Sequence, residues 1–181
     1  MATVGLCLFD TAIGWCAVAW SADGLTGVQL PEADQAATRA RMRARFPGVE
    51  EREPPPEVRE AVRRIAASLR GEPDDLRSIR LDETGVGAFP RRVYALLRAL
   101  PYGATTTYGE LAARLGEPGA ARAVGRALGD NPFAPVVPCH RVLAAGGGSG
   151  GFSAAGGVRT KLRMLSIEGA RFGAQPGLFD E

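Results

Sequence analysis

Three short apolar segments occupy the first thirty residues, and this pattern most limits how the chain can begin to fold. The segments are Val4–Phe9, Gly14–Trp20 and Gly24–Leu30, and each is rich in residues that favour strands. The turn-like sequences TAI and SADG separate them. We therefore expect the chain to begin with a small β-sheet.

The next fifty residues are mostly helical in character. Ala33–Phe46 has the composition of a helix, and its RARMRARF run places charge on most of the helix surface. A polar, proline-rich stretch, GVEEREPPP, interrupts the pattern. Glu57–Arg70 then repeats apolar residues at helical spacing and stops at Gly71. Leu76–Leu81 is predicted to form a last strand.

The residue pattern changes near residues 82–87, and we place a domain boundary there. Apolar residues at helical spacing predict a helix over Phe89–Leu100. Thr107 is placed to cap a short helix over Tyr108–Leu115, with Glu110 as its capping-box partner. The GEPG turn leads to a second short helix over Ala120–Leu128. Two short helices around a tight turn form a helix-turn-helix pattern, which many proteins use without binding DNA.

The second of these helices has an unusual content. Its small residues and its two arginines, one turn apart, are Ala121, Ala123, Gly125, Ala127, Arg122 and Arg126. Small side chains allow close approach to another surface. The helix is therefore either packed tightly in the core or pressed into a nucleic-acid groove, with its arginines facing phosphates or bases.

Charge and cysteine content narrow the possible function classes. Residues 1–83 carry 11 Arg and 14 Asp or Glu, whereas residues 84–181 carry 10 Arg, one Lys and 6 Asp or Glu. The basic second half suggests a polyanionic partner, or else ordinary charge fluctuation. Three scattered cysteines argue against a disulfide framework and fit a reducing cytoplasm. We find no apolar run long enough for a membrane span and no signal peptide.

The stretch VVPCHRV holds the only histidine, His140, beside Cys139. A catalytic cysteine reacts as the thiolate, and a histidine can take its proton. Neighbouring side chains diverge, so the pair needs a sharp turn or a bridging water. Pro138 favours an extended backbone before it and predicts a strand that ends just before Cys139. Glu168 is the best candidate to orient His140, and chance adjacency of a buried thiol and a histidine is the alternative.

The remaining cysteines and the glycine-rich segment complete this reading. Cys7 and Cys16 lie in strand segments and are expected to be core thiols, and the dispersed ligands predict no metal site. The sequence GGGSGGFSAAGG is predicted to form a flexible or ligand-hugging loop whose amides line a pocket.

PCHRV, together with ARAVGRAL, GDNPFAPVV and GGFSAAGGVRTKLRMLSIEG, resembles the O6-alkylguanine-DNA alkyltransferases, or methylated-DNA–protein-cysteine methyltransferases. The resemblance runs from about Phe89 to Gly169. It implies an α/β first domain over residues 1–83, with a ribonuclease H-like, three-stranded antiparallel sheet plus helices. A helical, winged-helix-like domain with the helix-turn-helix follows over residues 84–172, and residues 173–181 are left as a tail.

The activity that the resemblance implies is DNA repair by direct damage reversal. An alkyl group moves from O6-alkylguanine, and from O4-alkylthymine, in double-stranded DNA to Cys139. The base is flipped from the minor-groove side, and each molecule acts once, as a cytoplasmic monomer. No cofactor and no metal are implied.

Site roles also follow from the resemblance. Cys139 is the acceptor, His140 acts through a water, Glu168 orients His140, and Tyr108 donates a proton to the departing guanine. Arg122 fills the gap left by the flipped base. The rest of the groove-facing helix comprises Ala121, Ala123, Gly125 and Arg126. Asn131 is the hinge, and the pocket residues are Pro138, Val142, Phe152, Ser153 and Lys161. The plain alternatives are a core aromatic for Tyr108, a helix C-cap for Asn131, a solvated charge for Arg122 and loop filler for Ser153.

Other functions stay open on the same residues. A lesion sensor of this fold would flip alkylated guanine without chemistry, but such relatives carry another residue at the position of Cys139. A helix-turn-helix regulator would show sequence preference and no covalent change. A cysteine hydrolase fits less well. The absence of a cysteine-rich metal module disfavours the transcription-activator branch of the family.

Overall fold

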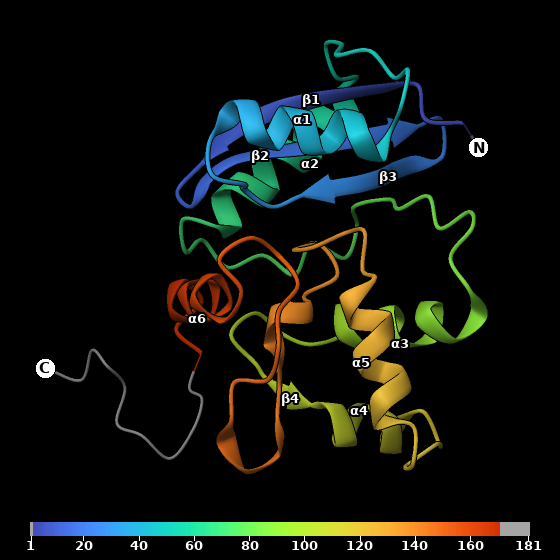
Figure 1. Ribbon diagram of the computed structural model, residues 1–181, viewed down its shortest axis with the longest axis vertical. Helices are drawn as coiled ribbons and strands as arrows, with labels where there is room; N and C mark the ends of the chain where they lie inside the picture. The colour runs from blue at the N-terminus through green and yellow to red at the C-terminus, as the bar shows by residue number, and fades with distance from the viewer. Residues whose placement is uncertain (1, 171–181) are drawn as a thin grey trace, which may run out of the picture.

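The three apolar segments at the start of the chain form an antiparallel sheet. The computed structural model describes residues 2–170, so the predicted tail, residues 173–181, lies outside the described residues. The strands are β1 (Gly5–Thr11), β2 (Gly14–Ser21) and β3 (Gly24–Gln29), in the order β1-β2-β3. The three strands expected from the sequence are therefore confirmed, and Figure 1 shows them at the top of the molecule.

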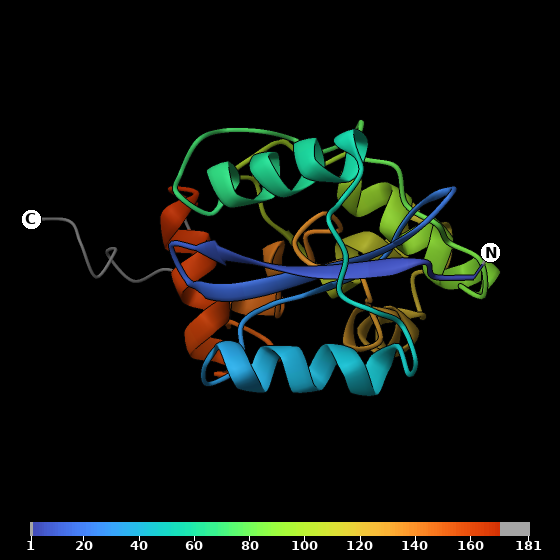
Figure 2. The same ribbon diagram turned by 90° about the horizontal axis from the view of Figure 1, so that it is seen from above.

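Two helices cover the two faces of this sheet. Figure 2 shows α1 (Gln35–Arg45) on one side of the strands and α2 (Pro56–Ser68) on the other. Successive side chains of a strand point to opposite faces, so β2 supplies both cores. Ala17 and Ala19 pack against Met42 of α1. The opposite face contributes Cys16, Val18 and Trp20 to a larger cluster with Val58 and Ile65 of α2.

Local sequence signals set where these two helices begin. The Asp34 carboxylate accepts a hydrogen bond of 2.8 Å from the Ala37 amide and caps α1. Pro56 occupies the first position of α2, where its missing N–H is no loss. Both helices lie within one or two residues of the predicted ranges.

The predicted strand over Leu76–Leu81 is wrong. Within this range only Leu81 pairs with the sheet, in an isolated parallel bridge to Leu25. The side chain of Arg98 donates hydrogen bonds to three carbonyl groups of the segment, those of Leu76, Arg77 and Ile79. Carbonyl groups engaged by a guanidinium favour a turn over a strand ladder, because the segment is held by a helix end.

A second core forms below the sheet from α3 (Ala88–Arg98), α4 (Tyr108–Arg114) and α5 (Ala121–Gly129). A fourth helix, α6 (Val158–Ile167), instead contributes Met164 to the core of the sheet. The predicted capping box of α4 is confirmed, since the Thr107 hydroxyl accepts from the Glu110 amide and the Glu110 carboxylate accepts from the Thr107 amide. The sequence reading did not anticipate α6.

A short parallel pair of strands joins the helix-turn-helix to the segment after Cys139. It consists of β4 (Thr106–Thr107) and β5 (Val142–Leu143). Because β4 runs directly into α4, this pairing fixes the start of α4 beside the Cys139 segment.

The sheet and the second core are bonded directly to each other. The carbonyl of Pro132, which follows α5, accepts a hydrogen bond from the Val28 amide of β3 at 2.8 Å. It accepts a second one from Arg45 of α1 at 3.2 Å, and the same guanidinium binds the Val28 carbonyl at 2.8 Å. Leu81, Ala134 and Phe152 pack against the apolar clusters of both parts.

The three cysteines are free thiols, and Cys16 is fully buried in the sheet core, as predicted. Cys7 is partly buried against the same core. Within residues 2–170, no helix has the length and apolar character needed to cross a lipid bilayer.

We predict that Gly24→Ala, at the start of β3 and against Arg80, destabilises the protein more than the same change at an exposed glycine. A Cβ at Gly24 would lie 2.6 Å from the Arg80 carbonyl oxygen, and the backbone φ is +147°. The free energy of unfolding should fall by roughly 3 kcal/mol. Gly48→Ala is the matched control, because φ is +76° and no atom lies within 4 Å; it should cost about 1 kcal/mol. Equal losses in urea unfolding would contradict the role given to Gly24.

Candidate active site

Cys139 lies in a tight turn, and not directly after a strand as the sequence suggested. The turn is the 3-10 helix η1 (Cys139–Arg141), and the residues that precede it form further turns. The Asn131 side chain holds these turns together. Its amide donates to the Val137 carbonyl at 2.9 Å, and its oxygen accepts from the Phe133 amide at 3.0 Å. Such side-chain bonds satisfy backbone groups that a strand ladder would otherwise use, which explains the incorrect prediction.

The two side chains that begin this turn have different partners: Asn131 and Lys161 act on Cys139, whereas Glu168 contacts His140. His140 is buried, and its Nε2 lies 2.7 Å from Glu168 Oε1. A carboxylate only accepts hydrogen bonds, so Nε2 carries the proton and Nδ1 is an acceptor. Nδ1 is buried and has no hydrogen-bond partner among residues 2–170. It is the atom left available for a bridging water.

Glu168, at the end of α6, is the charged centre of the site. Its side chain is 8% exposed, and it also accepts two hydrogen bonds of 2.9 Å from Arg141. Burial alone would raise the pKa of Glu168, but the hydrogen bonds from His140 and Arg141 outweigh it and bring the pKa to about 2. Glu168 is therefore ionised at neutral pH.

The resting protonation states of the neighbouring pair also follow from burial. Burial lowers the pKa of His140, although the hydrogen bond with Glu168 opposes this change. Burial raises the pKa of the Cys139 thiol, against smaller opposing effects of the Asn131 side chain and the Lys161 charge. At neutral pH the pair is therefore a neutral imidazole and a protonated thiol.

Tyr108 and Lys161 form a second group of polar side chains near the Cys139 segment. The Lys161 ammonium is buried, donates to the carbonyls of Val142 and Gly151, and lies 5.9 Å from the centre of the Tyr108 ring. Burial raises the pKa of Tyr108, and the charge of the Cys139 thiolate adds to this effect. Burial lowers the pKa of Lys161, and the charge of Cys139 opposes this change, so both groups lie close enough to Cys139 to interact with it.

The glycine-rich segment closes over Tyr108. A Cβ at Gly150 would lie 2.9 Å from the Tyr108 hydroxyl, and φ at Gly150 is +69°. Only glycine allows this approach without a shift of the ring. The segment therefore packs against the tyrosine, while the lining of a ligand pocket by its amides stays a prediction.

The remaining predicted pocket residues lie at different depths around this site. The Ser153 side chain is exposed and donates to the Gly129 carbonyl at 3.3 Å, at the end of α5. Phe152 is half-buried between the two cores, and Pro138 is buried at the start of η1. Asn131 is not the C-cap of α5, because Asp130 occupies that position.

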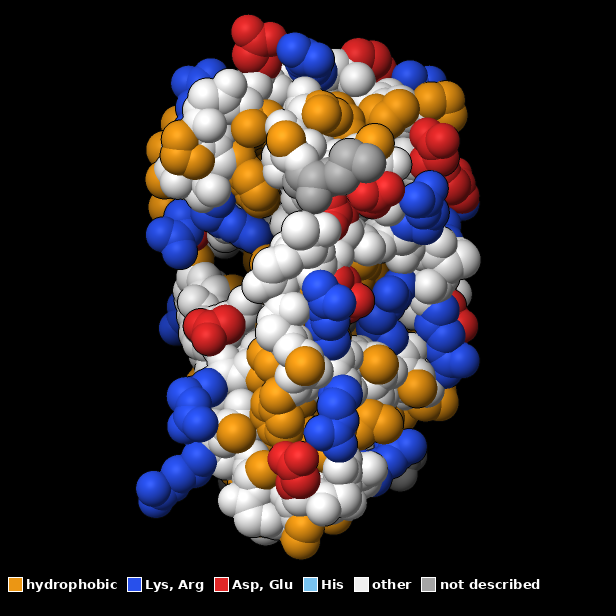
Figure 3. Space-filling view, turned by 90° about the vertical axis from the view of Figure 1, so that its right-hand side faces the viewer, with side chains coloured by type: hydrophobic (Ala, Val, Ile, Leu, Met, Phe, Trp, Pro, Cys, Tyr) orange, Lys and Arg blue, Asp and Glu red, His pale blue; other side chains and the backbone are white. Residues whose placement is uncertain are grey.

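The helix α5 presents its arginines to solvent. Val124, Ala127 and Leu128 form its buried face. Arg122 and Arg126 are exposed, and neither makes a hydrogen bond or ion pair with another described residue. The small residues Ala121, Ala123 and Gly125 are half-exposed. Figure 3 shows basic side chains spread over the lower half of one face of the molecule.

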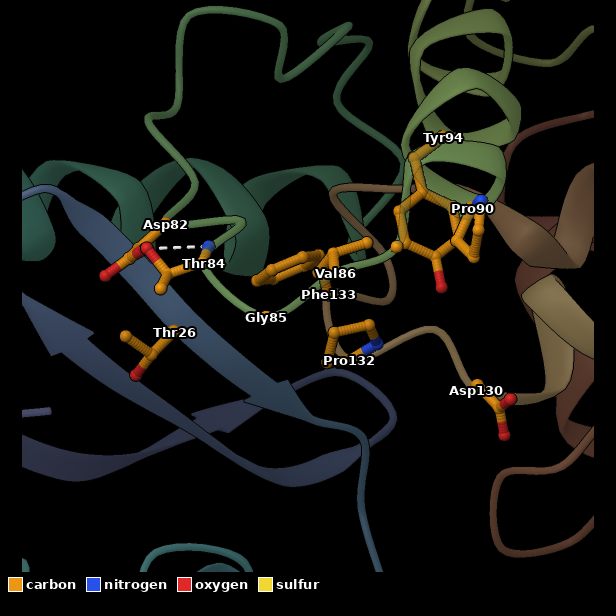
Figure 4. Close-up of a pocket in the computed structure, with 11 residues that line it drawn as sticks. Thr26, Asp82, Thr84, Gly85, Val86, Pro90, Tyr94, Asp130, Pro132 and Phe133 are labelled. Carbon is orange, nitrogen blue, oxygen red and sulfur yellow. Dashed lines mark hydrogen bonds between the residues drawn. The ribbon is translucent and has the colours of Figure 1, made fainter. Parts of the chain in front are cut away.

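A separate cavity of about 410 Å³ lies where β3, residues 82–87 and α3 meet. Thr26, Asp82, Tyr94 and Phe133 are among the residues that line it, and Figure 4 shows the 3.0 Å bond from the Thr84 amide to Asp82. None of the titratable residues around His140 lines this cavity. The chemistry of the site therefore rests on the Cys139 segment.

Sequence reasoning missed one buried charge in the site, Arg141. Its side chain is 5% exposed. The only signal was its position directly after His140, because its carboxylate partner lies 27 residues further along the chain.

Comparison with known proteins gives a consistent family. Residues 88–170 match the family described as "6-O-methylguanine DNA methyltransferase, DNA binding domain". A methylated-DNA–protein-cysteine methyltransferase of Mycolicibacterium paratuberculosis is 46% identical over 120 residues, which cover 66% of this chain and 70% of that protein. One of Salmonella typhimurium is 54% identical over 86 residues, 48% of this chain and 49% of that protein.

Solved structures resemble nearly the whole chain. The crystal structure of Mycobacterium tuberculosis OGT in complex with DNA is 32% identical, with a TM-score of 0.72, and covers 94% of this chain and 96% of its own. The O6-methylguanine-DNA methyltransferase of Pyrococcus kodakaraensis is 28% identical, with a TM-score of 0.73, covering 92% and 99%.

We predict that the ionised Glu168 stabilises the fold in a pH-dependent way. A carboxylate whose pKa falls from about 4.5 to about 2 on folding contributes stability above pH 4.5, which is lost as the pH falls toward 2. Glu168→Gln should therefore lower the free energy of unfolding at pH 7 by about 3 kcal/mol. The two proteins should become equally stable near pH 2. Urea unfolding across this range measures the difference, and a difference that does not change with pH would refute the prediction.

Proposed function

The chain belongs to the methylated-DNA–protein-cysteine methyltransferase family, and we propose that it acts by moving an alkyl group from O6-alkylguanine in duplex DNA to its own Cys139. It is a DNA-binding enzyme that repairs DNA by alkyl transfer. The observation that carries the residue assignment is the buried set of Cys139, His140 and Glu168, with a free Nδ1 on His140.

The proposed chemistry follows from the resting protonation states. A water relays the Cys139 proton to His140 Nδ1, and Glu168 stabilises the imidazolium that forms. The thiolate sulfur bonds to the alkyl carbon while the carbon–O6 bond breaks and its electron pair stays on guanine. Tyr108 gives its hydroxyl proton to the departing guanine, and Lys161 lies near the phenolate that remains. Solvent then returns a proton to Tyr108 and takes one from His140, so the charges balance without a cofactor.

The product explains why we propose a single turnover. Cys139 ends as a thioether, which lacks the acidic proton and the charge that made the thiol a nucleophile. Nothing in the set of His140, Glu168 and Tyr108 supplies a route for cleaving a carbon–sulfur bond.

We propose that α5 enters the minor groove and that the alkylated base is flipped toward Cys139. An alkyl group on O6 lies inside the duplex, so the base must leave the stack before the thiol can reach it. The exposed arginines and the small residues of α5 support this docking, since a narrow groove needs a slim helix. O4-alkylthymine is proposed as a second substrate, and the enzyme is proposed to act as a monomer.

The finer architecture is also a proposal. We assign residues 1–83 to a ribonuclease H-like α/β domain, supported by the three-stranded antiparallel sheet with a helix on each face. Residues 84–172 form the DNA-binding and active-site domain, supported by the separate core around α3, α4 and α5. The winged-helix-like description rests on the α4–α5 pair and the adjoining β4–β5 ladder.

We predict that Cys139→Ser abolishes alkyl transfer and keeps DNA binding, because the thiol is separate from the exposed face of α5. Intact-protein mass after incubation with O6-methylguanine DNA should show one added methyl group on the wild type and none on the variant. A methyl gain by the variant would remove Cys139 from the acceptor role. Wild-type protein that binds the lesion without gaining mass would indicate a sensor, and strong sequence preference would indicate a regulator.

Arg122 and Arg126 should separate base extrusion from electrostatic attraction. If Arg122 fills the vacated stack, Arg122→Ala should lose at least about tenfold more repair of duplex DNA than of free O6-benzylguanine, which needs no flipping. Arg126→Ala should weaken DNA binding and lower the salt dependence by about one unit of slope, as expected for one phosphate contact. Single-turnover rates and a salt series provide the measurements. Proportionate losses on duplex and free base would withdraw the extrusion role from Arg122.

A further inference from the structure

We propose that Arg141 is a positioning residue for the transfer reaction, because its guanidinium fixes the Glu168 carboxylate in the orientation that serves His140. The inference rests on the proposed transfer to Cys139. Arg141 does not reach the reacting atoms in this reading, and it acts only through Glu168 and His140.

The contact between Arg141 and Glu168 is a two-point contact. Nε donates to Oε2 and Nη2 donates to Oε1, each at 2.9 Å. Two parallel hydrogen bonds fix the plane of a carboxylate as well as its position. Oε1 is the atom that His140 Nε2 meets at 2.7 Å. The orientation of the imidazole therefore depends on a carboxylate that Arg141 holds in place.

Arg141 is itself immobilised by parts of the chain outside η1. Its Nη1 donates to the Leu100 carbonyl at 3.2 Å, and its guanidinium lies 5.7 Å from the centre of the Tyr102 ring. The Tyr102 hydroxyl in turn donates to the Ser68 carbonyl at the end of α2, at 3.0 Å. The Leu100 carbonyl holds one edge of the guanidinium and the Tyr102 ring covers one face, so the group has little freedom to move.

The charge of Arg141 also keeps His140 available as a base. The other titratable groups around the His140–Glu168 pair are Cys139, Lys161 of α6 and Tyr102 of the loop after α3. Arg141 and Glu168 form a neutral pair, so the resting imidazole has no uncompensated anion beside it. Without Arg141, the Glu168 charge would favour a second proton on His140, and a protonated imidazole cannot accept the thiol proton.

The test compares Arg141→Gln and Arg141→Lys with an equivalent arginine elsewhere. Arg64 makes the same two-point contact with Asp74, at 2.8 and 2.6 Å, in the first half of the chain. Arg64→Gln and Arg64→Lys are therefore matched controls for loss of a bidentate ion pair. Single-turnover rates on duplex O6-methylguanine DNA are measured across pH and normalised to the fraction of molecules that intact mass shows to be alkylated.

Arg141→Gln should lower the rate at pH 7 on the order of tenfold. The acid limb of its pH–rate profile should move to higher pH by about one unit, because without the cation a proton enters the His140–Glu168 pair at higher pH. Arg141→Lys keeps the positive charge but loses the two parallel hydrogen bonds to Glu168. Its rate should therefore fall while the acid limb of its pH–rate profile stays in place. Both Arg64 variants should react as the wild type does.

Several outcomes would overturn the proposal. A slower Arg141→Gln protein with an unmoved acid limb, or one that loses only its reactive fraction, would make Arg141 a residue of the fold alone. If Arg141→Gln does not fold, a wild-type rate for Arg141→Lys at every pH overturns the proposed orientation of Glu168. A wild-type protein that gains no alkyl mass would instead refute the proposed function, and with it this inference.

Discussion

One buried negative charge, on Glu168, organises the structure around Cys139. A carboxylate placed in the interior needs partners, since leaving it unpaired would cost several kcal/mol. His140 and Arg141 supply them from adjacent positions of one tight turn. The turn at Cys139–Arg141 follows directly on the loop that the Asn131 side chain holds. The Glu168 carboxylate reaches this turn because α6 ends at Glu168. A change in any of these elements therefore reaches the thiol through the same carboxylate.

Burial keeps the Cys139 thiol in its less reactive, protonated form in this structure. Cys139 is buried, and burial raises the pKa of its thiol above the ordinary value, so at neutral pH it is protonated. The thiolate is the form that reacts with oxidants and binds metals, so a protonated, buried sulfur is protected from both. In the proposed transfer, the negative charge that forms when Cys139 gives its proton to His140 passes to the departing guanine as the sulfur bonds to the alkyl carbon.

Local patterns predicted those elements whose causes lie within a few residues. The three strands and the Thr107–Glu110 capping box are confirmed, because runs of strand-favouring residues, turn signals and capping act over short stretches. Leu76–Leu81 failed as a strand because Arg98, about twenty residues away, takes its carbonyls. The partners of Cys139 could be named from the resemblance, but the role of Arg141 depends on a contact with Glu168 that spacing does not reveal.

The carbonyl of Pro132 ties the first half of the chain to the loop on which Asn131 lies. Its two partners, Val28 and Arg45, come from the sheet and from α1, and they grip the loop that carries Asn131 from behind. The matched family region, residues 88–170, contains every proposed catalytic group but neither of these partners. A fragment trimmed to that region would keep the proposed catalytic side chains but lose the hydrogen bonds from Val28 and Arg45 that hold the Asn131 loop. The sheet and α1 carry none of the proposed catalytic residues, yet their bonds to Pro132 limit how far such an enzyme can be shortened.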